Sequence, residues 1–179
     1  LLALSEFNVR NHERAGELLD LLLSNNPPTP ARLSLAVLND LALGRESDAL
    51  KRAEDLYRRF DKVPVARVTR AVVALREGKP DIAVDALGPL MQHEDVPAHA
   101  YLLAGRAFLE SGALAQGMKY LRLAAAKGPD DPEWLSRIAL AQFASPEGAD
   151  LSGLDTALDL DPHALSAGIV RVLDRALAD

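Results

Sequence analysis

Small and apolar residues recur every 34 residues along most of this chain of 179 residues. One such column is Gly105, Ala71, Val37 and Ala3, continued forwards by Ala139. Three more columns are Gly117, Ala83, Ala49 and Ala15; Leu121, Leu87, Ala53 and Leu19; and Gly112, Gly78, Gly44 and Arg10, continued forwards by Pro146. Several columns in phase at this period are typical of a solenoid built from helical hairpins.

One repeat is clearest near the middle of the chain, where the pattern predicts helices over residues 98–111 and 113–127 joined by a turn at Gly112. Apolar side chains three and four residues apart give each helix one buried face. Gly105 and Gly117 fall inside these helices, where Gly costs about 1 kcal/mol relative to Ala. We therefore expect the two backbones to approach closely at these glycines.

This pattern resembles the tetratricopeptide repeat (TPR), a motif of 34 residues. The residues that carry the resemblance are Tyr101, Gly105, Phe108, Gly117, Leu121, Ala124 and Pro129. The resemblance implies an all-α fold, a right-handed superhelix (α-solenoid) of antiparallel helix hairpins, in one domain over residues 1–179. The predicted repeats are 1–29 (partial), 30–63, 64–97, 98–131, 132–164, and 165–179 (partial, or a capping helix).

The third repeat departs from the pattern. Arg67 and Arg70 occupy positions that are apolar in other repeats, and we expect one of them to pair with Asp40 of the preceding repeat; a slightly rotated helix is the alternative. Gly88 and Pro89 fall inside the predicted second helix. Because Pro removes a backbone hydrogen bond and clashes with the preceding turn, we expect that helix to kink or break there.

Composition excludes several classes of function. The net charge is −6, which disfavours nucleic acid as the main partner. The chain has no cysteine, so a zinc–thiolate site, a disulfide and a cysteine nucleophile are excluded. No apolar run approaches the roughly 20 residues that span a bilayer, so we expect no direct membrane insertion. Because the sequence begins with Leu1 in mid-pattern, we interpret it as part of a longer protein.

Three clusters resemble functional motifs, and each has a simpler explanation. The set Gly112, Gly117, Met118 and Lys119 lacks the Gly-Lys-Ser/Thr order of a phosphate-binding loop. His93, Glu94, Asp95 and His99 could supply zinc ligands, but an inter-repeat loop is polar in any case. Asp150, Asp155, Asp159 and Asp161 lack the spacing of a calcium loop. We predict no catalytic residue, no cofactor and no metal, and hence a protein that is not an enzyme.

The surface predicted to carry function is the concave wall that the first helix of each hairpin lines in TPR-like arrays. Side chains at the second, fifth and ninth places of these helices share one face. They are Ala31, Ser34, Leu38, Val65, Val68, Val72, His99, Leu102, Arg106, Glu133, Ser136 and Leu140. We expect Val68, Val72 and Leu102 to lie near one another. The wall suits an apolar peptide, a helix or a folded partner; alternatively, neighbouring repeats of the full protein cover it.

These observations predict a non-enzymatic scaffold that binds a protein or peptide. Segments 31–36, 42–50 and 158–162 resemble TPR-repeat lipoproteins of the PEP-CTERM system. That resemblance implies a role in exopolysaccharide or protein-sorting machinery, on the periplasmic side of a Gram-negative envelope, with the cytoplasm as the alternative. A different class remains open, in which the array is the regulatory arm of an enzyme such as a glycosyltransferase or kinase.

Overall fold

The computed structural model describes residues 1–93 and 95–128, and every element within them is helical. The α-helices are α1 (Leu2–Asn8), α2 (His12–Asn25), α3 (Pro30–Ala42), α4 (Glu46–Phe60), α5 (Pro64–Arg76), α6 (Pro80–Leu87), α7 (Ala98–Glu110) and α8 (Leu114–Lys127). The chain divides into two compact units, Leu1–Leu90 and Met91–Asp179. The predicted all-α class is confirmed.

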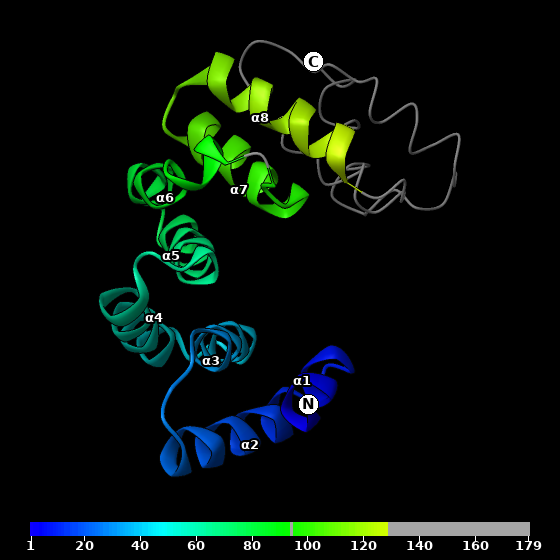
Figure 1. Ribbon diagram of the computed structural model, residues 1–179, viewed down its shortest axis with the longest axis vertical. Coiled ribbons are helices and arrows are strands. Elements are labelled where there is room, and N and C mark those ends of the chain that lie inside the picture. The colour runs from blue at the N-terminus through cyan, green and yellow to red at the C-terminus, as the bar shows by residue number, and fades with distance from the viewer. Residues whose placement is uncertain (94, 129–179) are drawn as a thin grey trace, which may run out of the picture. The chain divides into compact units, whose positions relative to one another are not determined.

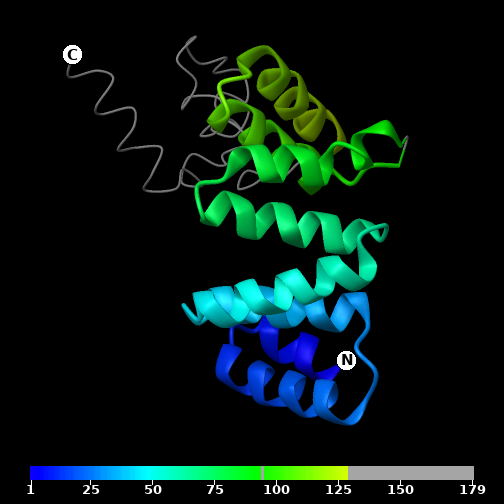
Figure 2. The same ribbon diagram turned by 90° about the vertical axis from the view of Figure 1, so that its left-hand side faces the viewer.

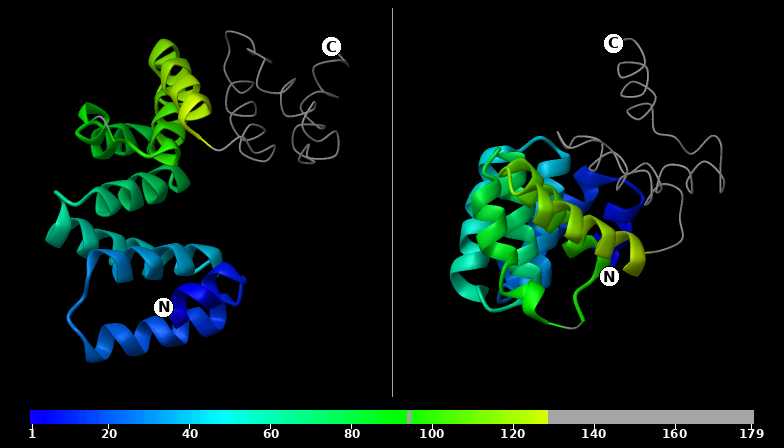
Figure 3. Two further views of the ribbon diagram at one scale, coloured as in Figure 1. Left: turned by 45° about the vertical axis from the view of Figure 1, so that its right-hand side comes forward. Right: turned by 90° about the horizontal axis from the view of Figure 1, so that it is seen from above.

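The first unit consists of three antiparallel hairpins, α1–α2, α3–α4 and α5–α6. In Figure 1, α4 and α6 lie on the left of this unit and α1, α3 and α5 lie to their right, while α2 runs along the bottom, below α3. The same helices are stacked one above another in Figure 2 and in the left view of Figure 3. Besides the contacts within each hairpin, α2 packs on α3, α4 on α5, and α3 on α5. The first helices of the second and third repeats, α3 and α5, therefore contact each other.

The turn column has one backbone conformation in all four described hairpins. Gly44, Gly78 and Gly112 have φ values of 72°, 67° and 85°, and Arg10 has a φ of 62°. The next residue's amide then closes the helix end; for example, the amide of Arg45 donates to the carbonyl of Asp40 at 2.8 Å. Glycine adopts this left-handed conformation without strain, whereas an arginine does not. Three of the four positions thus have the residue that the turn requires.

The columns of small residues form the interior. Ala15, Ala49 and Ala83, which begin the second helices, are completely buried, as are Val37 and Ala71 of the first helices. Side chains of this size let neighbouring helices approach, and their burial stabilises the stack by about 25 cal/mol per Å² of apolar surface. The repeat period therefore reflects the spacing of the helix contacts.

In the second unit, α7 and α8 cross at Gly105 and Gly117. A Cβ atom on Gly105 would lie 2.6 Å from Cγ of Leu121 and 3.2 Å from the carbonyl oxygen of Gly117. The distance of 3.2 Å to a backbone atom is tighter than the great majority of real Cβ contacts, so the close approach of the two backbones that the sequence predicts is confirmed.

The expectation that Asp40 pairs with Arg67 or Arg70 is wrong. The carboxylate of Asp40 pairs with Arg52 of α4, with Oδ2 of Asp40 lying 2.9 Å from Nε of Arg52. Arg67 instead donates to the carbonyl of Ala86 at 3.4 Å. The guanidinium carbon of Arg70 lies 3.8 Å from the centre of the Tyr57 ring. The pairing with Arg52 is shorter-ranged in sequence, because α3 and α4 belong to the same hairpin.

The break near Gly88 is confirmed. Helix α6 ends at Leu87, and a 3₁₀ turn over Leu90–Gln92 follows Pro89. The fifth repeat, residues 132–164, and the segment 165–179 lie outside the described residues, as does the acidic run that begins at Asp150. Of the helices that are described, none has the length and apolar character needed to cross a membrane.

Candidate interaction surfaces

The predicted concave wall lies on α3 and α5 in the first unit. Ala31 is exposed, and the apolar side chains of Leu38, Val65, Val68 and Val72 are half-buried. Pro30 and Pro64 begin the two helices at the first helical position, where the missing N–H costs no hydrogen bond. These five residues, Ala31, Leu38, Val65, Val68 and Val72, are called the α3–α5 wall below.

Ser34 does not belong to that wall. It is only 5% exposed, and its Oγ lies 2.7 Å from Oγ1 of Thr69 on α5. Because Thr69 donates its hydroxyl proton to the carbonyl of Val65 at 2.7 Å, Ser34 is the donor in the pair. The prediction that Ser34 lines an exposed surface is corrected: helical spacing placed it on the right side of α3, at the edge where α5 packs.

Part of the Val72 side chain packs in the interior of the first unit. It packs against the buried cluster of Val37, Leu41, Ala49, Ala53 and Val73. A charge at this position would disturb the core as well as the wall. Val68 is half-buried on the same side of the helix, one turn nearer its N-terminus, so it is the better position for a substitution that reports on binding.

The second unit contains three further predicted wall residues, all on α7. His99 and Arg106 are exposed and Leu102 is half-buried. Arg106 forms an ion pair with Glu110 at 3.0 Å, one turn along the helix. The remaining predicted residues, Glu133, Ser136 and Leu140, lie outside the described residues. The predicted proximity of Leu102 to Val68 and Val72 stays a prediction.

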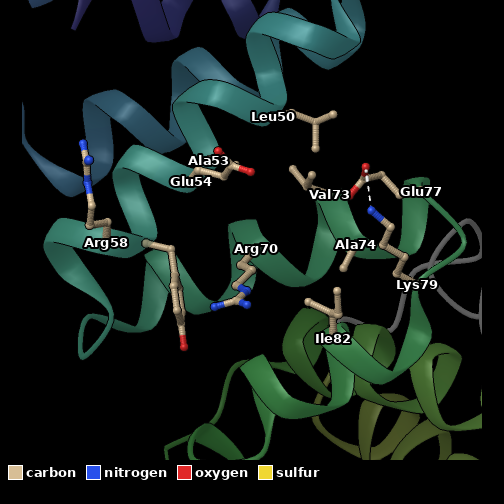
Figure 4. Close-up of a pocket in the computed structure, with 11 residues that line it drawn as sticks. Leu50, Ala53, Glu54, Arg58, Arg70, Val73, Ala74, Glu77, Lys79 and Ile82 are labelled. Atoms are coloured by element: carbon tan, nitrogen blue, oxygen red, sulfur yellow. Dashed lines mark hydrogen bonds and ion pairs between the residues drawn. The ribbon is translucent and has the colours of Figure 1, made fainter.

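One pocket of the first unit was not predicted from the sequence. It is a pocket of about 310 Å³ between α4, α5 and α6, called the α4–α6 pocket. Figure 4 shows its side chains, with Leu50, Ala53 and Glu54 on α4, Arg70 and Val73 on α5, and Ile82 on α6. The complete lining is Leu50, Ala53, Glu54, Tyr57, Arg58, Arg70, Val73, Ala74, Glu77, Lys79 and Ile82.

The pocket and the wall use different sides of α5. Each helical residue turns the chain by about 100°, so Arg70 and Val73 lie about 200° and 140° around the axis from Val68. Such angles place the two features on nearly opposite faces of the helix. A partner bound at one of them leaves the other accessible on this helix.

Three helices of the first unit are joined by a charged cluster. Arg52 of α4 contacts Oδ1 of Asp20 on α2 at 2.7 Å and Oδ2 of Asp40 on α3 at 2.9 Å. The Asp40 side chain is 6% exposed and that of Arg52 is 28% exposed. Burial raises the pKa of Asp40 above its ordinary value of 3.8, and the positive charge of Arg52 offsets only part of that increase. The cluster links α2, α3 and α4, and none of its three residues lines the α4–α6 pocket or belongs to the α3–α5 wall.

The loop before α7 has the residue types of a metal site but not the arrangement. His93, Asp95 and His99 are exposed, and Glu94 lies outside the described residues. Across residues 1–93 and 95–128, no three His, Asp or Glu side chains are grouped so that they could hold a metal ion. In the loop from α7 to α8, Gly112 makes the turn and Gly117 makes the helix crossing, so both glycines have structural roles.

The sequence matches no family model and no curated protein. Several solved structures match the fold. The chain is similar to TTC0263, a thermophilic TPR protein of Thermus thermophilus, with 21% identity, a TM-score of 0.74, and coverage of 98% of this chain and 96% of that one. It is similar to YrrB, described as a TPR protein with an unusual peptide-binding site, with 18% identity, a TM-score of 0.63, and coverage of 91% and 85%. MamA from Desulfovibrio magneticus RS-1 matches with 15% identity, a TM-score of 0.63, and coverage of 99% and 93%.

These structures share little sequence with this chain, but they match its fold over most of its length. This protein is therefore a tetratricopeptide-repeat array in its fold.

Proposed function

We propose that this chain is a non-enzymatic scaffold that binds an apolar peptide or an amphipathic helix along the α3–α5 wall. The observation that carries the proposal is the row of apolar side chains, from Leu38 on α3 to Val65, Val68 and Val72 on α5, that the fold leaves half-exposed. None of these side chains carries a charge. A site that holds the C-terminal carboxylate of a peptide through charged side chains is therefore disfavoured, and an apolar contact is favoured.

The residue types support this proposal. Valine is β-branched and loses side-chain freedom in a helix, so the solvent-exposed part of Val65 and Val68, which are not part of the core cluster that Val72 contacts, gains nothing for α5 alone. A helix also needs no apolar residue on a face that only meets water. Apolar side chains kept on that face are explained by a contact with another surface. The peptide-binding site reported for YrrB, a protein of the same fold, supports a peptide as that surface.

A selection experiment tests the proposal without a known partner. The probe is a library of random peptides displayed on phage, panned against the immobilised 179-residue chain. We expect enriched peptides with two or three aliphatic or aromatic residues at a regular spacing. A library that yields no enriched peptide, or only uniformly polar ones, would contradict an apolar binding wall.

We also propose, on the resemblance of segments 31–36, 42–50 and 158–162 to PEP-CTERM-system lipoproteins, that the array works in a Gram-negative cell envelope, in exopolysaccharide or protein-sorting machinery. Fractionation of cells that express the complete protein tests this proposal. Recovery with the membranes, facing the periplasm, is the expected result, and recovery with the cytosol would contradict it.

A further inference from the structure

We infer that the α4–α6 pocket is a second binding site, and that it takes a peptide segment with an aliphatic side chain beside a single Asp or Glu carboxylate. The site lies on the other side of α5 from the α3–α5 wall, so it goes beyond the proposed function and does not depend on it. Three independent features of the pocket support the inference: its apolar floor, one arginine that pairs with no carboxylate of the described residues, and the arrangement of its remaining charges.

The floor of the pocket is apolar and well packed. Ala53, Val73 and Ala74 are 6%, 5% and 3% exposed, so their side chains already belong to the core of the unit. Leu50 is half-buried, and Ile82 is 36% exposed, which makes it one of the few large apolar side chains open to solvent in the described part of the chain. An aliphatic side chain that enters here would cover Ile82 and gain apolar contacts.

Arg70 gives the site its preference for an anion. Its guanidinium carbon lies 3.8 Å from the centre of the Tyr57 ring, and the side chain is half-buried. No carboxylate of residues 1–93 or 95–128 forms an ion pair with it, and no hydrogen bond to it is formed within this part of the chain. Stacking on an aromatic ring holds the guanidinium plane while leaving its N–H groups free to donate. A planar, oriented arginine of this kind suits a carboxylate.

The other charged side chains of the lining limit what the anion can be. Glu77 and Lys79 form an ion pair at 3.2 Å, and Arg58 is paired with Asp55. Glu54, which is exposed, lines the pocket as well. This exposed carboxylate in the lining repels a long polyanion such as a nucleic acid. A ligand with one carboxylate can meet Arg70 and leave Glu54 in water.

Fluorescence polarisation with defined peptides tests the site. The probes are labelled hexapeptides with blocked ends, each containing one Leu or Ile and one Glu one or two positions away, with Ser and Gly elsewhere. A matched set carries Gln in place of Glu. A charge-assisted hydrogen bond is expected to make the best Glu peptide bind about tenfold more tightly than its Gln counterpart.

Three variants of the full chain decide the result. Arg70→Gln should remove the preference for Glu, whereas Arg76→Gln, an exposed arginine on the same helix that does not line the pocket, should keep it. Ile82→Glu should weaken binding at least tenfold while the chain stays folded, because Ile82 is on the surface. If Arg70→Gln unfolds at the temperature of the binding assay, Ile82→Glu still tests whether the peptides bind in the pocket.

The inference is overturned if no Glu peptide binds saturably up to about millimolar concentration, or if the preference for Glu survives Arg70→Gln. It is also overturned if Val68→Glu, on the α3–α5 wall, weakens these peptides as much as Ile82→Glu does. In that case the peptides bind at the wall, and the result would bear on the proposed function instead.

Discussion

Gly105 and Gly117 face each other across the α7–α8 crossing so closely that neither position has room for a side chain. A Cβ atom at Gly117 would lie 3.1 Å from the carbonyl oxygen of Gly105 and 2.6 Å from Cγ of Leu109. The relationship is reciprocal, because a Cβ atom at Gly105 meets the carbonyl of Gly117 and the side chain of Leu121 in the same way. Helix propensity alone would favour Ala at both positions by about 1 kcal/mol, so packing decides against it.

Gly105→Leu should therefore destabilise the chain. Leu121 is completely buried, so a larger side chain at Gly105 overpacks the crossing, which typically costs about 1–3 kcal/mol. The matched control is Ala115→Leu, at an exposed position on α8. Chemical denaturation should show a clear loss of unfolding free energy for Gly105→Leu and almost none for Ala115→Leu. Equal effects would refute the crossing.

A substitution at Arg10 is expected to stabilise the chain, in contrast to Gly105→Leu. It has a φ of 62° at a position where the other described hairpins have Gly44, Gly78 and Gly112. A left-handed conformation costs a non-glycine residue about 1–2 kcal/mol, and Gly avoids this cost. Gly also has more conformational freedom in the unfolded chain, which offsets part of the gain in stability. Arg10→Gly should raise the free energy of unfolding by about 0.5–1 kcal/mol.

The same substitution inside a helix is the control for Arg10. Arg14→Gly on α2 should lower the free energy of unfolding by about 1 kcal/mol, because Gly is a poor helix former and the ion pair with Glu17 is lost. Melting curves of the two variants should shift in opposite directions. A shift in the same direction would show that the turn at Arg10 is not strained.

Much of the fold could be predicted from the sequence because the determinants are local and repeat. The glycines Gly44, Gly78 and Gly112 each indicate a turn. The small residues Ala15, Ala49 and Ala83 each indicate a contact between helices. Both patterns can be recognised from the local sequence and its repeat. The close approach at Gly105 follows from the cost of Gly in a helix.

The partners of long polar side chains could not be predicted in this way. Arg52 reaches both Asp20 and Asp40 because α2 packs beside the α3–α4 hairpin, and helical spacing does not give that geometry. The α4–α6 pocket could not be predicted for the same reason, since its lining comes from three helices. A signal was present at Arg70, a charged residue at a position that is apolar in other repeats, but only the structure brings Tyr57 and Ile82 to the same pocket.

Stability should depend on pH through Asp40. Its pKa is raised in the folded chain by burial, so the folded chain binds this proton more tightly than the unfolded chain. The stabilising contribution is complete below the ordinary pKa of 3.8 and is lost as the pH rises through the raised, folded value. Asp40→Asn should remove this component. We expect the unfolding free energy of the wild type, relative to Asp40→Asn, to fall as the pH rises over the range above the ordinary pKa of 3.8. A difference that is constant or rises over that range would contradict the assignment.

The measurement that tests the central claim most directly is the affinity of a phage-selected apolar peptide for a chain with a charge in the α3–α5 wall. The two wall variants are Val68→Glu and Ala31→Glu. Ala31 is exposed in the first turn of α3, where an acidic residue interacts favourably with the helix dipole, so its variant is expected to fold normally. The matched control is Ile82→Glu, an apolar-to-Glu change at the α4–α6 pocket, outside the wall.

Calorimetry of binding and thermal melting are recorded on the same samples. The account predicts that Val68→Glu loses about 2 kcal/mol or more of binding free energy, as a central apolar contact does, and that Ala31→Glu also weakens binding while its melting temperature is unchanged. Ile82→Glu should bind the peptide as the wild type does. Wild-type affinity in both wall variants, or an equal loss in Ile82→Glu, would contradict the claim that this array binds its partner along α3 and α5.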